Sequence, residues 1–400
     1  MSRNAPAGWE LPDRRWVLHS TTLLGNLTDR WISLQSRPSE RYDARLLGRS
    51  LAPDGVREPT WLAAADRRDL ALAHRALFKS GGASSRLLAR PFGASPPAVV
   101  HVHYGPLASV QTGLAETLGA GLVASFYGYD ATESRFVESP RWRRRYRRLF
   151  ERVRAVVAEG PRMAERVQDL GCPPEKLHVV RMPADAGALR DCERPKADGF
   201  LCCLAGRFIE KKGFDVGIRA FARGLGDRPD ARLLIVGGGE LEPELRRVAA
   251  DAGVADRVDW AGRLPFREFM SAIGRAHVGL YPSRTAANGD SEGGAPVTLI
   301  EAQWLGVPSV VSSHDDLPFV AAPAGSVVLS PDDVDAWAET LRELHRSPER
   351  VEHMAAAARA FARAHHSPEE NARERDAVYD VASGAAAGAS AEGVEWARSA

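Results

Sequence analysis

The sequence of 400 residues is short of cysteine and of long apolar runs, and each shortage excludes a class of protein. No stretch of about eighteen apolar residues occurs, which argues against a membrane-spanning helix. The four cysteines form neither a CxxC pair nor a zinc-binding spacing, so we interpret them as reduced thiols. The formal net charge of +1 gives no overall attraction to nucleic acid, and we expect no such partner. Residues 1–13 carry no apolar signal core, so we expect a cytoplasmic protein.

The chain does contain a regular alternation of short apolar runs with amphipathic stretches of helical length. This alternation is typical of an α/β fold, in which helices cover both faces of a parallel sheet. The rhythm restarts near Phe200, which predicts two Rossmann-like doubly wound domains facing a cleft. The predicted strands are Trp16–His19, Val99–Val102, Leu122–Phe126, Ala155–Ala158, His178–Arg181, Phe200–Leu204, Arg232–Val236, Arg257–Trp260, Val278–Tyr281, Ser309–Ser312 and Val327–Leu329.

The polar stretch Asp191–Gly199 separates the two halves of this pattern, so we place the first domain at residues 1–195 and the second at 196–366. A further helix is predicted over residues 367–382. One placement open to this helix is against the first domain. Residues 383–400 are rich in Ala, Gly and Ser, a composition that predicts a disordered tail.

The most informative segment is a Gly-rich turn that runs into a helix, from Asp290 to Glu301. Pro296 suits the first helical position, where a missing N–H costs nothing. The first N–H groups of such a helix carry partial positive charge, and the glycines let an anion approach them. Glu301 lies among apolar residues, where ligand hydroxyls would give its carboxylate partners. A ligand with an anion at the helix N-terminus and hydroxyls one helical turn further on would be a sugar nucleotide. The competing interpretation is a capped core helix with Glu301 turned to solvent.

A basic turn opens the second domain. A strand ends at Gly206, Arg207 follows at once, and Lys212 precedes a helix that begins near Asp215. The adjacent pair of Lys211 and Lys212 stands out because the whole chain has only five lysines. One bidentate cation and one point charge at a strand end suit a diphosphate. A solvated basic turn is the competing interpretation.

Polar residues also end two neighbouring strands of the first domain. His101 and His103 alternate along one strand and therefore point to the same face, and Tyr127 and Asp130 follow the next strand. Together they would make a polar sugar site. An HxH pair can bind a metal, but no third ligand has a matching spacing, so we predict no metal.

Two charged segments have simpler explanations. Arg141–Arg154 carries eight arginines and one apolar helical face, as expected for a surface helix with a solvated basic side. The functional alternative is peripheral contact with anionic lipid at the inner face of the cell membrane, or with a lipid-phosphate acceptor. The acidic run Asp332–Asp335 directly precedes a helical pattern, so helix capping explains it better than metal binding.

Taken together, these elements resemble the retaining family-4 glycosyltransferases of the GT-B fold, from about Trp16 to about Val381. Gly206-Arg207 with Lys212-Gly213 is similar to that family's G-R-x-x-x-x-K-G element. The resemblance implies that Arg207 and Lys212 hold the donor diphosphate. Within the family, the chain looks most like the bacterial exopolysaccharide and colanic-acid-type transferases.

The segment from Glu292 to Glu301 resembles the family's E-x7-E element. The resemblance implies that Glu301 binds ribose hydroxyls and that Glu292 contacts the transferred sugar. Here eight residues rather than seven separate the two acids, so either Glu292 reaches the sugar through a wider loop or Gly293 takes that position. The implied donor-binding residues are Gly206, Gly293, Gly294, Ala295, Pro296, Val297, Thr298 and Glu301.

In the first domain, His103 is similar to the family's histidine near the sugar. Many relatives have Phe-His-Gly where this chain has Phe126-Tyr127-Gly128, and a phenol does not titrate near neutral pH. Tyr127 and Asp130 are our sugar-side candidates, and we expect the acceptor near Gly25–Asn26.

The resemblance implies transfer of a sugar from a nucleoside diphosphate sugar to a sugar, lipid-linked or small-molecule acceptor, in cell-surface polysaccharide or glycoconjugate synthesis. His103, Arg207, Lys212 and Glu292 are the catalytic candidates. The nucleotide sugar is a co-substrate, and no cofactor is expected. The alternatives are a non-catalytic nucleotide-sugar-binding protein, a GT-B-fold epimerase and a glycoside phosphorylase. A NAD-dependent oxidoreductase fits less well, because the Gly-rich fingerprint after the first strand is missing.

Overall fold

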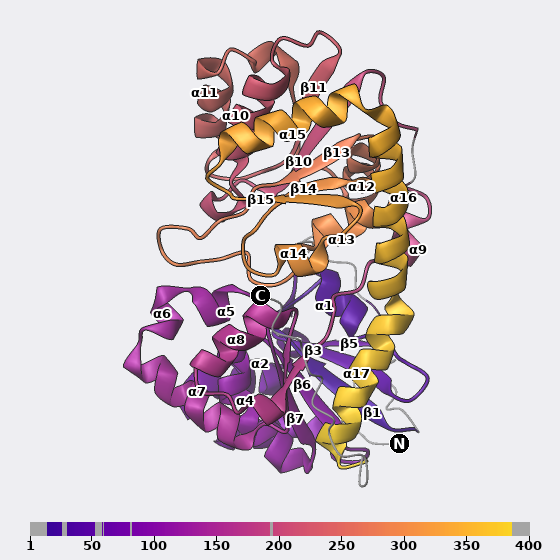
Figure 1. Cartoon of the computed structure of the whole chain (residues 1–400). Coiled ribbons are helices and arrows are strands. Elements are labelled where there is room, and N and C mark those ends of the chain that lie inside the picture. The colour runs from indigo at the N-terminus through magenta and orange to yellow at the C-terminus, as the bar shows by residue number, and fades with distance from the viewer. Residues whose placement is uncertain are drawn as a thin grey trace. The chain divides into compact units, whose positions relative to one another are not determined.

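The computed structural model describes residues 14–25, 30–52, 58, 60–80, 82–192 and 195–385. The chain forms two compact units, and the first is assembled from both ends of the sequence (Figure 1). It comprises Met1–Arg181 with Glu369–Ala400, and the second unit comprises Met182–Pro368. The change of unit after Arg181 comes earlier in the chain than the sequence-based division at 195–196. Of the predicted disordered tail, residues 386–400 lie outside the described residues.

The first unit contains a seven-stranded sheet whose neighbouring strands are all parallel. The strand order is β5-β3-β1-β6-β7-β8-β9, so the chain builds one half outward from β1 and then returns to build the other half from β6. The strands of this sheet are β1 (Trp16–Ser20), β3 (Asp43–Gly48), β5 (Trp61–Ala63), β6 (Val99–His103), β7 (Gly121–Phe126), β8 (Ala155–Ala158) and β9 (Leu177–Val179), and β2 (Leu23–Leu24) pairs separately with β4 (Ser50–Leu51).

Side chains alternate between the two faces of this sheet, and each face has its own core. On β6, Val100 and Val102 belong to the larger core, whereas Val99 belongs to a second core that contains Val378 and Tyr379 of α17 (Pro368–Ser383). A Cβ at Gly121 would meet the carbonyl of Ala382 at 2.1 Å, so α17 approaches β7 closely. The C-terminal helix therefore covers the face of the sheet that the odd-numbered residues of β6 share.

The helices of the first unit follow from clear local signals. Pro161, for example, stands at the start of α8, where its missing N–H costs nothing. Gly119 ends α4 in a left-handed conformation, which favours glycine. The helices are α1 (Arg30–Gln35), α2 (Arg68–Ser80), α3 (Gly82–Ala89), α4 (Gly105–Leu118), α5 (Tyr129–Thr132), α6 (Ser134–Val137), α7 (Pro140–Arg152), α8 (Pro161–Asp169) and α17.

The second unit contains a six-stranded parallel sheet in the order β12-β11-β10-β13-β14-β15. Two Rossmann-like doubly wound units, as the sequence predicts, are therefore confirmed. The strands are β10 (Phe200–Arg207), β11 (Ala231–Gly238), β12 (Val258–Gly262), β13 (Val278–Tyr281), β14 (Ser309–Ser312) and β15 (Ser326–Leu329).

Helices of the second unit form two groups around its sheet (Figure 1). In one group α10 packs against α11 and α15, and in the other α13 packs against α9, α12 and α16. The apolar side chains of β10 and β11 pack with Trp337 of α15 and Phe221 of α10 in the main core. The helices are α9 (Ala186–Leu189), α10 (Phe214–Leu225), α11 (Glu242–Asp251), α12 (Phe266–Gly274), α13 (Val297–Trp304), α14 (Leu317–Val320), α15 (Val334–Arg346) and α16 (Pro348–His365).

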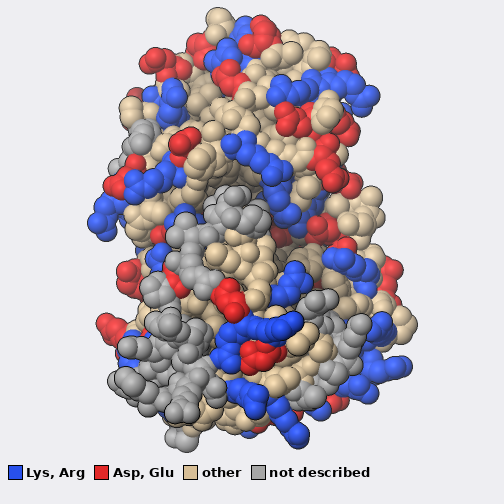
Figure 2. Space-filling view, turned by 180° about the vertical axis from the view of Figure 1, so that it is seen from behind, with Lys and Arg blue, Asp and Glu red and all other residues tan. Residues whose placement is uncertain are grey.

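The surface carries charges of both signs. Figure 2 shows Lys and Arg mixed with Asp and Glu over the visible face, in keeping with the formal net charge of +1. Recognition of a charged ligand must therefore come from local groups of side chains rather than from the field of the whole molecule.

Candidate active-site residues in each unit

Each parallel sheet reverses its strand order once, and ligands of doubly wound folds bind at the carboxyl ends of the strands beside such a reversal. In the first unit, the reversal lies between β1 and β6, which carry His19 and His103 at their carboxyl ends. In the second unit, it lies between β10 and β13, which end at Arg207 and Tyr281. The predicted catalytic residues therefore belong to these two edges or to the loops that follow them.

The basic turn after β10 depends on two glycines. Gly206 has a φ of 143°, which favours glycine, and a Cβ placed there would lie 3.8 Å from Cε of Lys212. Gly213 has a φ of 62°, and its Cβ would meet the carbonyl oxygen of Pro282 at 1.9 Å. Gly206 is therefore required by its backbone conformation, since 3.8 Å is an ordinary contact, whereas Gly213 lets the turn pack against the segment after β13.

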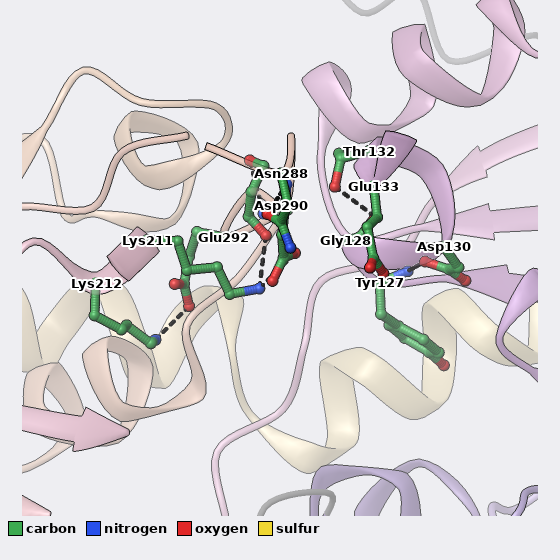
Figure 3. Close-up of polar contacts among 12 residues, drawn as sticks. Tyr127, Gly128, Asp130, Thr132, Glu133, Lys211, Lys212, Asn288, Asp290 and Glu292 are labelled. Carbon is green, nitrogen blue, oxygen red and sulfur yellow. Dashed lines mark hydrogen bonds and ion pairs between the residues drawn. The ribbon is translucent and has the colours of Figure 1, made fainter. Parts of the chain in front are cut away.

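Lys212 forms a buried ion pair with Glu292. Its Nζ donates to Oε1 of Glu292, and the two side chains are 15% and 7% exposed (Figure 3). Burial lowers the pKa of the Lys212 ammonium, Glu292 opposes that effect, and the charges of Lys211 and Arg207 lower the pKa further. Arg207 itself, the last residue of β10, is exposed. Glu292, one of the two candidates for the first acidic position, is thus the partner of Lys212.

The second oxygen of Glu292, Oε2, is buried and has no hydrogen-bond partner among the described residues. A buried acceptor without a partner is costly, and such groups in native structures call for an explanation. The carboxylate therefore has one oxygen held by Lys212 and one oxygen still able to accept a hydrogen bond from a ligand.

The Gly-rich turn enters α13 as the sequence suggests, with one correction. Gly293 has a φ of 79°, and Pro296 is the N-cap of the helix with extended backbone, so α13 begins at Val297 rather than at Pro296. The prediction of Pro296 as the first helical residue was wrong by one position. Gly294 and Ala295 lie in the turn, and Thr298 lies in the first turn of the helix, whose N–H groups carry partial positive charge.

Glu301 is only 4% exposed, so the alternative in which it faces solvent is wrong. Its neighbour Tyr281, at the end of β13, donates from its hydroxyl to the carbonyl of Thr298 at 3.1 Å. Burial raises the pKa of Tyr281, and the charges of Cys203 and Glu301 raise it further. Glu301 is thus a buried carboxylate inside the second unit, one helical turn beyond the start of α13.

In the first unit, three histidines come together on the face of the sheet that α17 covers. His19 Nδ1 and His103 Nε2 share a hydrogen bond of 3.0 Å, and the rings of His101 and His103 are stacked with centroids 4.6 Å apart. Tyr379 of α17 bonds to His101 Nδ1 at 2.8 Å and to His19 Nε2 at 3.4 Å. Tyr127 bonds to His103 Nδ1 at 2.6 Å. The predicted common face of His101 and His103 is confirmed.

All three imidazoles are neutral at ordinary pH. Burial lowers the pKa of His103 to about 3 and the pKa values of His19 and His101 well below the usual range, and the Arg375 charge lowers all three further. Their ligating nitrogens lie within 4.8 Å of one another, so the structure supplies in His19 the third histidine that the sequence spacing missed. Every ring nitrogen already has a hydrogen-bond partner, with Ser125 holding His101 Nε2 at 2.6 Å, and a nearby buried guanidinium disfavours a bound cation.

Two aromatic residues that the sequence analysis missed surround His103. Trp31 of α1 lies with its ring centroid 4.2 Å from Tyr127 and 6.4 Å from His103. Tyr104 follows His103 with a φ of 76°, a conformation uncommon outside glycine, and its ring packs against those of Trp31 and Tyr127. Backbone strain of this kind gathers at functional sites, and a non-glycine residue of this conformation leaves no signal in the sequence.

The carboxylate of Asp130 is bound to the protein backbone and does not face a ligand site. Its carboxylate is fully buried and accepts hydrogen bonds from the backbone N–H of Gly105 at 2.9 Å and of Tyr127 at 3.0 Å. Burial raises the pKa of Asp130 to about 6 against the effect of these donors. Asp130 therefore joins the loops after β6 and β7, which carry Tyr104 and Tyr127 on either side of His103.

Three other candidates have clear positions. Gly25 follows β2 with a φ of 68°, whereas Asn26, the second acceptor-side residue, lies outside the described residues. The acidic run before α15 is a helix cap, since Asp333 accepts from the backbone N–H of Ala336 at 3.0 Å, as predicted. Helix α7 buries Tyr146 and leaves most of its arginines exposed.

Among the described residues, none of the helices combines the length and the apolar character that crossing a bilayer requires.

Comparison with known proteins shows the family of the chain. Residues 40–187 match the family model Glycosyltransferase Family 4, and residues 188–361 match Glycosyl transferases group 1. The amylovoran biosynthesis glycosyltransferase AmsK of Erwinia amylovora is 31% identical over 293 residues, which cover 70% of each chain. The chain belongs to the family-4 glycosyltransferases of the GT-B fold.

The chain is also similar to a second curated protein and shares its fold with a solved structure. A GDP-mannose-dependent monoacylated alpha-(1-6)-phosphatidylinositol monomannoside mannosyltransferase of Corynebacterium glutamicum is 37% identical over 158 residues. These residues cover 40% of this glycosyltransferase but only 41% of that relative. The crystal structure of Anabaena Alr3699/HepE in complex with UDP shares the fold, with a TM-score of 0.70 at 11% identity, and covers 91% of this chain and 98% of that one.

Proposed function

We propose that this glycosyltransferase moves a sugar from a nucleoside diphosphate sugar to an acceptor hydroxyl with retention at the anomeric carbon. The observation that carries the proposal is the largely buried pair of Lys212 and Glu292 at the strand-order reversal, where β10 ends at the exposed Arg207. Two cations at this edge of the sheet and a carboxylate with one oxygen that has no partner among the described residues can hold a diphosphate and a sugar hydroxyl.

Departure of the donor diphosphate places negative charge where these groups lie. The Lys212 ammonium, the Arg207 guanidinium and the first N–H groups of α13 would stabilise that charge as it develops. A phosphate oxygen would replace the carboxylate as the partner of Lys212, and Glu292 would then accept hydrogen bonds from the sugar. Because protein cations and helix N–H groups supply the neutralising charge, we propose that turnover needs neither a divalent metal nor a cofactor.

The remaining candidates would orient the reactants. Glu301 is proposed to accept hydrogen bonds from the ribose hydroxyls, because it is a buried carboxylate one turn from the start of α13. Tyr127 is proposed to contact the sugar, with Gly25 near the acceptor. Both ring nitrogens of the buried His103 are held, by His19 and by Tyr127, so His103 would act on the sugar through the Tyr127 hydroxyl and without titrating.

The names of the relatives support a biological setting. AmsK acts in amylovoran biosynthesis, and the Corynebacterium relative is a phosphatidylinositol monomannoside mannosyltransferase. We propose that this chain builds a cell-surface polysaccharide or glycoconjugate, and that its acceptor is a sugar or a lipid-linked sugar. The exposed arginines of α7 support a second element of the proposal, peripheral contact with an anionic lipid surface.

A donor screen followed by turnover tests the proposal. UDP-, GDP-, ADP- and TDP-linked sugars are compared by thermal shift, because a ligand that binds the native state raises Tm. Nucleoside diphosphate release is then measured with and without acceptors, in EDTA, and the anomeric configuration of the product is determined by NMR. Donor conversion without acceptor would indicate an epimerase, dependence on inorganic phosphate a phosphorylase, and binding without turnover a nucleotide-sugar-binding protein. An inverted product or loss of turnover in EDTA would overturn the retaining or metal-independent parts.

A further inference from the structure

Lys211 and Lys212 are adjacent, but their side chains leave the same short turn toward different acids. The turn is the 3-10 segment Glu210–Lys212, and Figure 3 shows Lys211 reaching Asp290 while Lys212 reaches Glu292. Lys211 Nζ donates to Oδ1 of Asp290 at 2.9 Å and to the carbonyl oxygen of Ser291 at 2.8 Å. The Lys211 side chain is 10% exposed, so this ammonium is largely removed from water and held by two acceptors.

The same turn is joined to the loop before Glu292 by two further hydrogen bonds. The backbone N–H of Arg284 donates to the Lys211 carbonyl at 2.9 Å, and the N–H of Ala287 donates to Oε2 of Glu210 at 3.1 Å. Asp290 closes the loop on itself, because its carbonyl accepts from the N–H of Ala286 at 2.8 Å. Besides the pair of Lys212 with Glu292, the loop is thus attached to this turn through residues 210 and 211, and Arg284 at its start also pairs with Asp215 of α10 at 3.0 Å.

Ser291 is fixed from its other side as well. Its hydroxyl bonds to Nε2 of His314 at 2.9 Å and to the carboxylate of Asp315, and Asp315 has a left-handed backbone with a φ of 45°. The backbone of Ser291 is thus held by Lys211 while its side chain is held by the segment after β14. Glu292 is the next residue, so its direction is set by a peptide that has little freedom.

We propose that Lys211 is a positioning residue, which fixes Asp290 and Ser291 so that Glu292 faces Lys212 and the donor. The inference rests on the proposed function for its kinetic consequence. The anchor acts on Asp290 and Ser291, the two residues immediately before Glu292, and so limits the conformations open to the Glu292 side chain. The two lysines thus have separate tasks: Lys212 meets the ligand, and Lys211 holds the loop.

The charges fit this division. The Asp290 carboxylate neutralises the Lys211 ammonium, which also donates a second hydrogen bond to the Ser291 carbonyl. Glu292, in contrast, engages Lys212 with one oxygen and keeps Oε2 without a hydrogen-bond partner in the described part of the chain. A diphosphate that arrives at the turn can displace the incompletely satisfied Glu292, whereas the contacts of Lys211 have no reason to exchange.

The test compares Lys211→Met, which keeps the apolar stem, with Asp290→Asn, which removes the partner charge. The first readout is limited trypsin digestion, because Arg284 lies at the start of the loop and cleavage after it reports loop release. We expect both variants to be cut after Arg284 about tenfold faster than the wild type, since a lost buried pair frees the segment. Arg223→Met, which breaks the exposed pair with Asp335, is the matched control and should be cut at the wild-type rate.

The second readout is kinetic. In Lys211→Met we expect kcat/KM for the donor to fall about tenfold or more through misplacement of Glu292, while UDP and GDP bind within about threefold of the wild type. The double variant Lys211→Met/Asp290→Asn should be no worse than either single variant, because both remove one contact. Lys211→Arg, which keeps a cation, should recover part of the activity.

The outcomes separate this inference from the proposed function. Wild-type cleavage after Arg284 together with wild-type kcat/KM in Lys211→Met would overturn the positioning role, and so would equal losses of kcat/KM and of UDP and GDP binding. If no donor is turned over by the wild type, the proposed function fails, yet the trypsin readout still decides whether Lys211 holds the loop. If Lys211→Met does not fold, Asp290→Asn carries both readouts.

Discussion

His19 Nδ1 lies 3.0 Å from His103 Nε2, although 84 residues separate the two histidines in the chain. The contact exists because β1 and β6 are neighbours at the strand-order reversal and both side chains point to the face covered by α17. With Tyr127 on the other nitrogen of His103, both ring nitrogens are held, so the orientation of the ring is set before any sugar arrives.

This arrangement predicts a pH profile without a histidine step. Because burial lowers the pKa of His103 to about 3, the imidazole is neutral throughout pH 5–8, and its protonation should not limit turnover there. We expect kcat/KM measured across this range to have the same shape in the wild type and in His103→Asn, with a lower level in the variant. A limb near pH 6.5 that is present in the wild type and absent in the variant would contradict the neutral role.

Lys212→Ala tests the charge that would stabilise the leaving diphosphate. We expect kcat to fall by about 10²-fold or more, the loss typical of a preorganised electrostatic group. Because the single variant leaves Glu292 buried without its partner, Lys212→Ala/Glu292→Gln is the control that removes both charges. The double variant should fold and be equally slow. Near-normal turnover in either variant would remove Lys212 from the mechanism.

Donor binding should weaken at alkaline pH for a reason specific to Lys212. Burial lowers the pKa of this ammonium below the usual value of about 10.4, so it loses its proton at a lower pH than an exposed lysine does. A diphosphate favours the charged form, and therefore affinity should fall as pH rises through the pKa of Lys212 in the free protein. Isothermal titration with UDP and GDP between pH 7 and pH 10 measures this. An affinity that stays constant across the range would refute it.

Strand positions could be predicted where a run of apolar residues is bounded by turn signals. The predicted bounds of β8, β13 and β14 coincide with the structure. The predictions omitted β3 and β5, because β3 (Asp43–Gly48) contains Asp43 and Arg45 and β5 spans only three residues. β3 therefore lacks the uniform apolar character that marks a buried parallel strand, and β5 is apolar but too short to stand out in the sequence.

The site could be predicted where its residues lie close in sequence, and not where distant segments meet. Gly206 and Arg207 end β10 and Lys212 ends the short 3-10 segment that follows, so their spacing in the sequence is informative. The pairing of Lys212 with Glu292 joins residues 80 apart, and the contact of His101 with Tyr379 joins residues 278 apart. Such contacts follow from the order of strands and the return of α17, neither of which leaves a local pattern.

Glu301→Ala should weaken nucleotide binding while leaving the diphosphate site intact. Hydrogen bonds to a charged group contribute roughly 1.5–3 kcal/mol, so we expect UDP or GDP affinity to fall by about tenfold or more. Inorganic pyrophosphate lacks the ribose and serves as the internal control, with an unchanged affinity. Because Glu301 is buried, Glu301→Gln is the second variant should the alanine variant be unstable. Unchanged affinity for both nucleotides would refute the ribose role.

The basic helix α7 predicts salt-sensitive binding to anionic vesicles. Its buried side, with Tyr146, Leu149 and Phe150, packs in the core, so the exposed arginines are free to face a lipid surface without unfolding the helix. Each arginine near an anionic membrane contributes about 1 kcal/mol at low salt, so Arg144→Gln/Arg148→Gln should weaken pelleting with phosphatidylserine vesicles by about tenfold or more. The control Arg219→Gln/Arg247→Gln changes the charge of the second unit by the same amount and should pellet as the wild type does. Equal binding by all three proteins, or binding that does not fall as salt rises, would show that α7 is a solvated surface helix only.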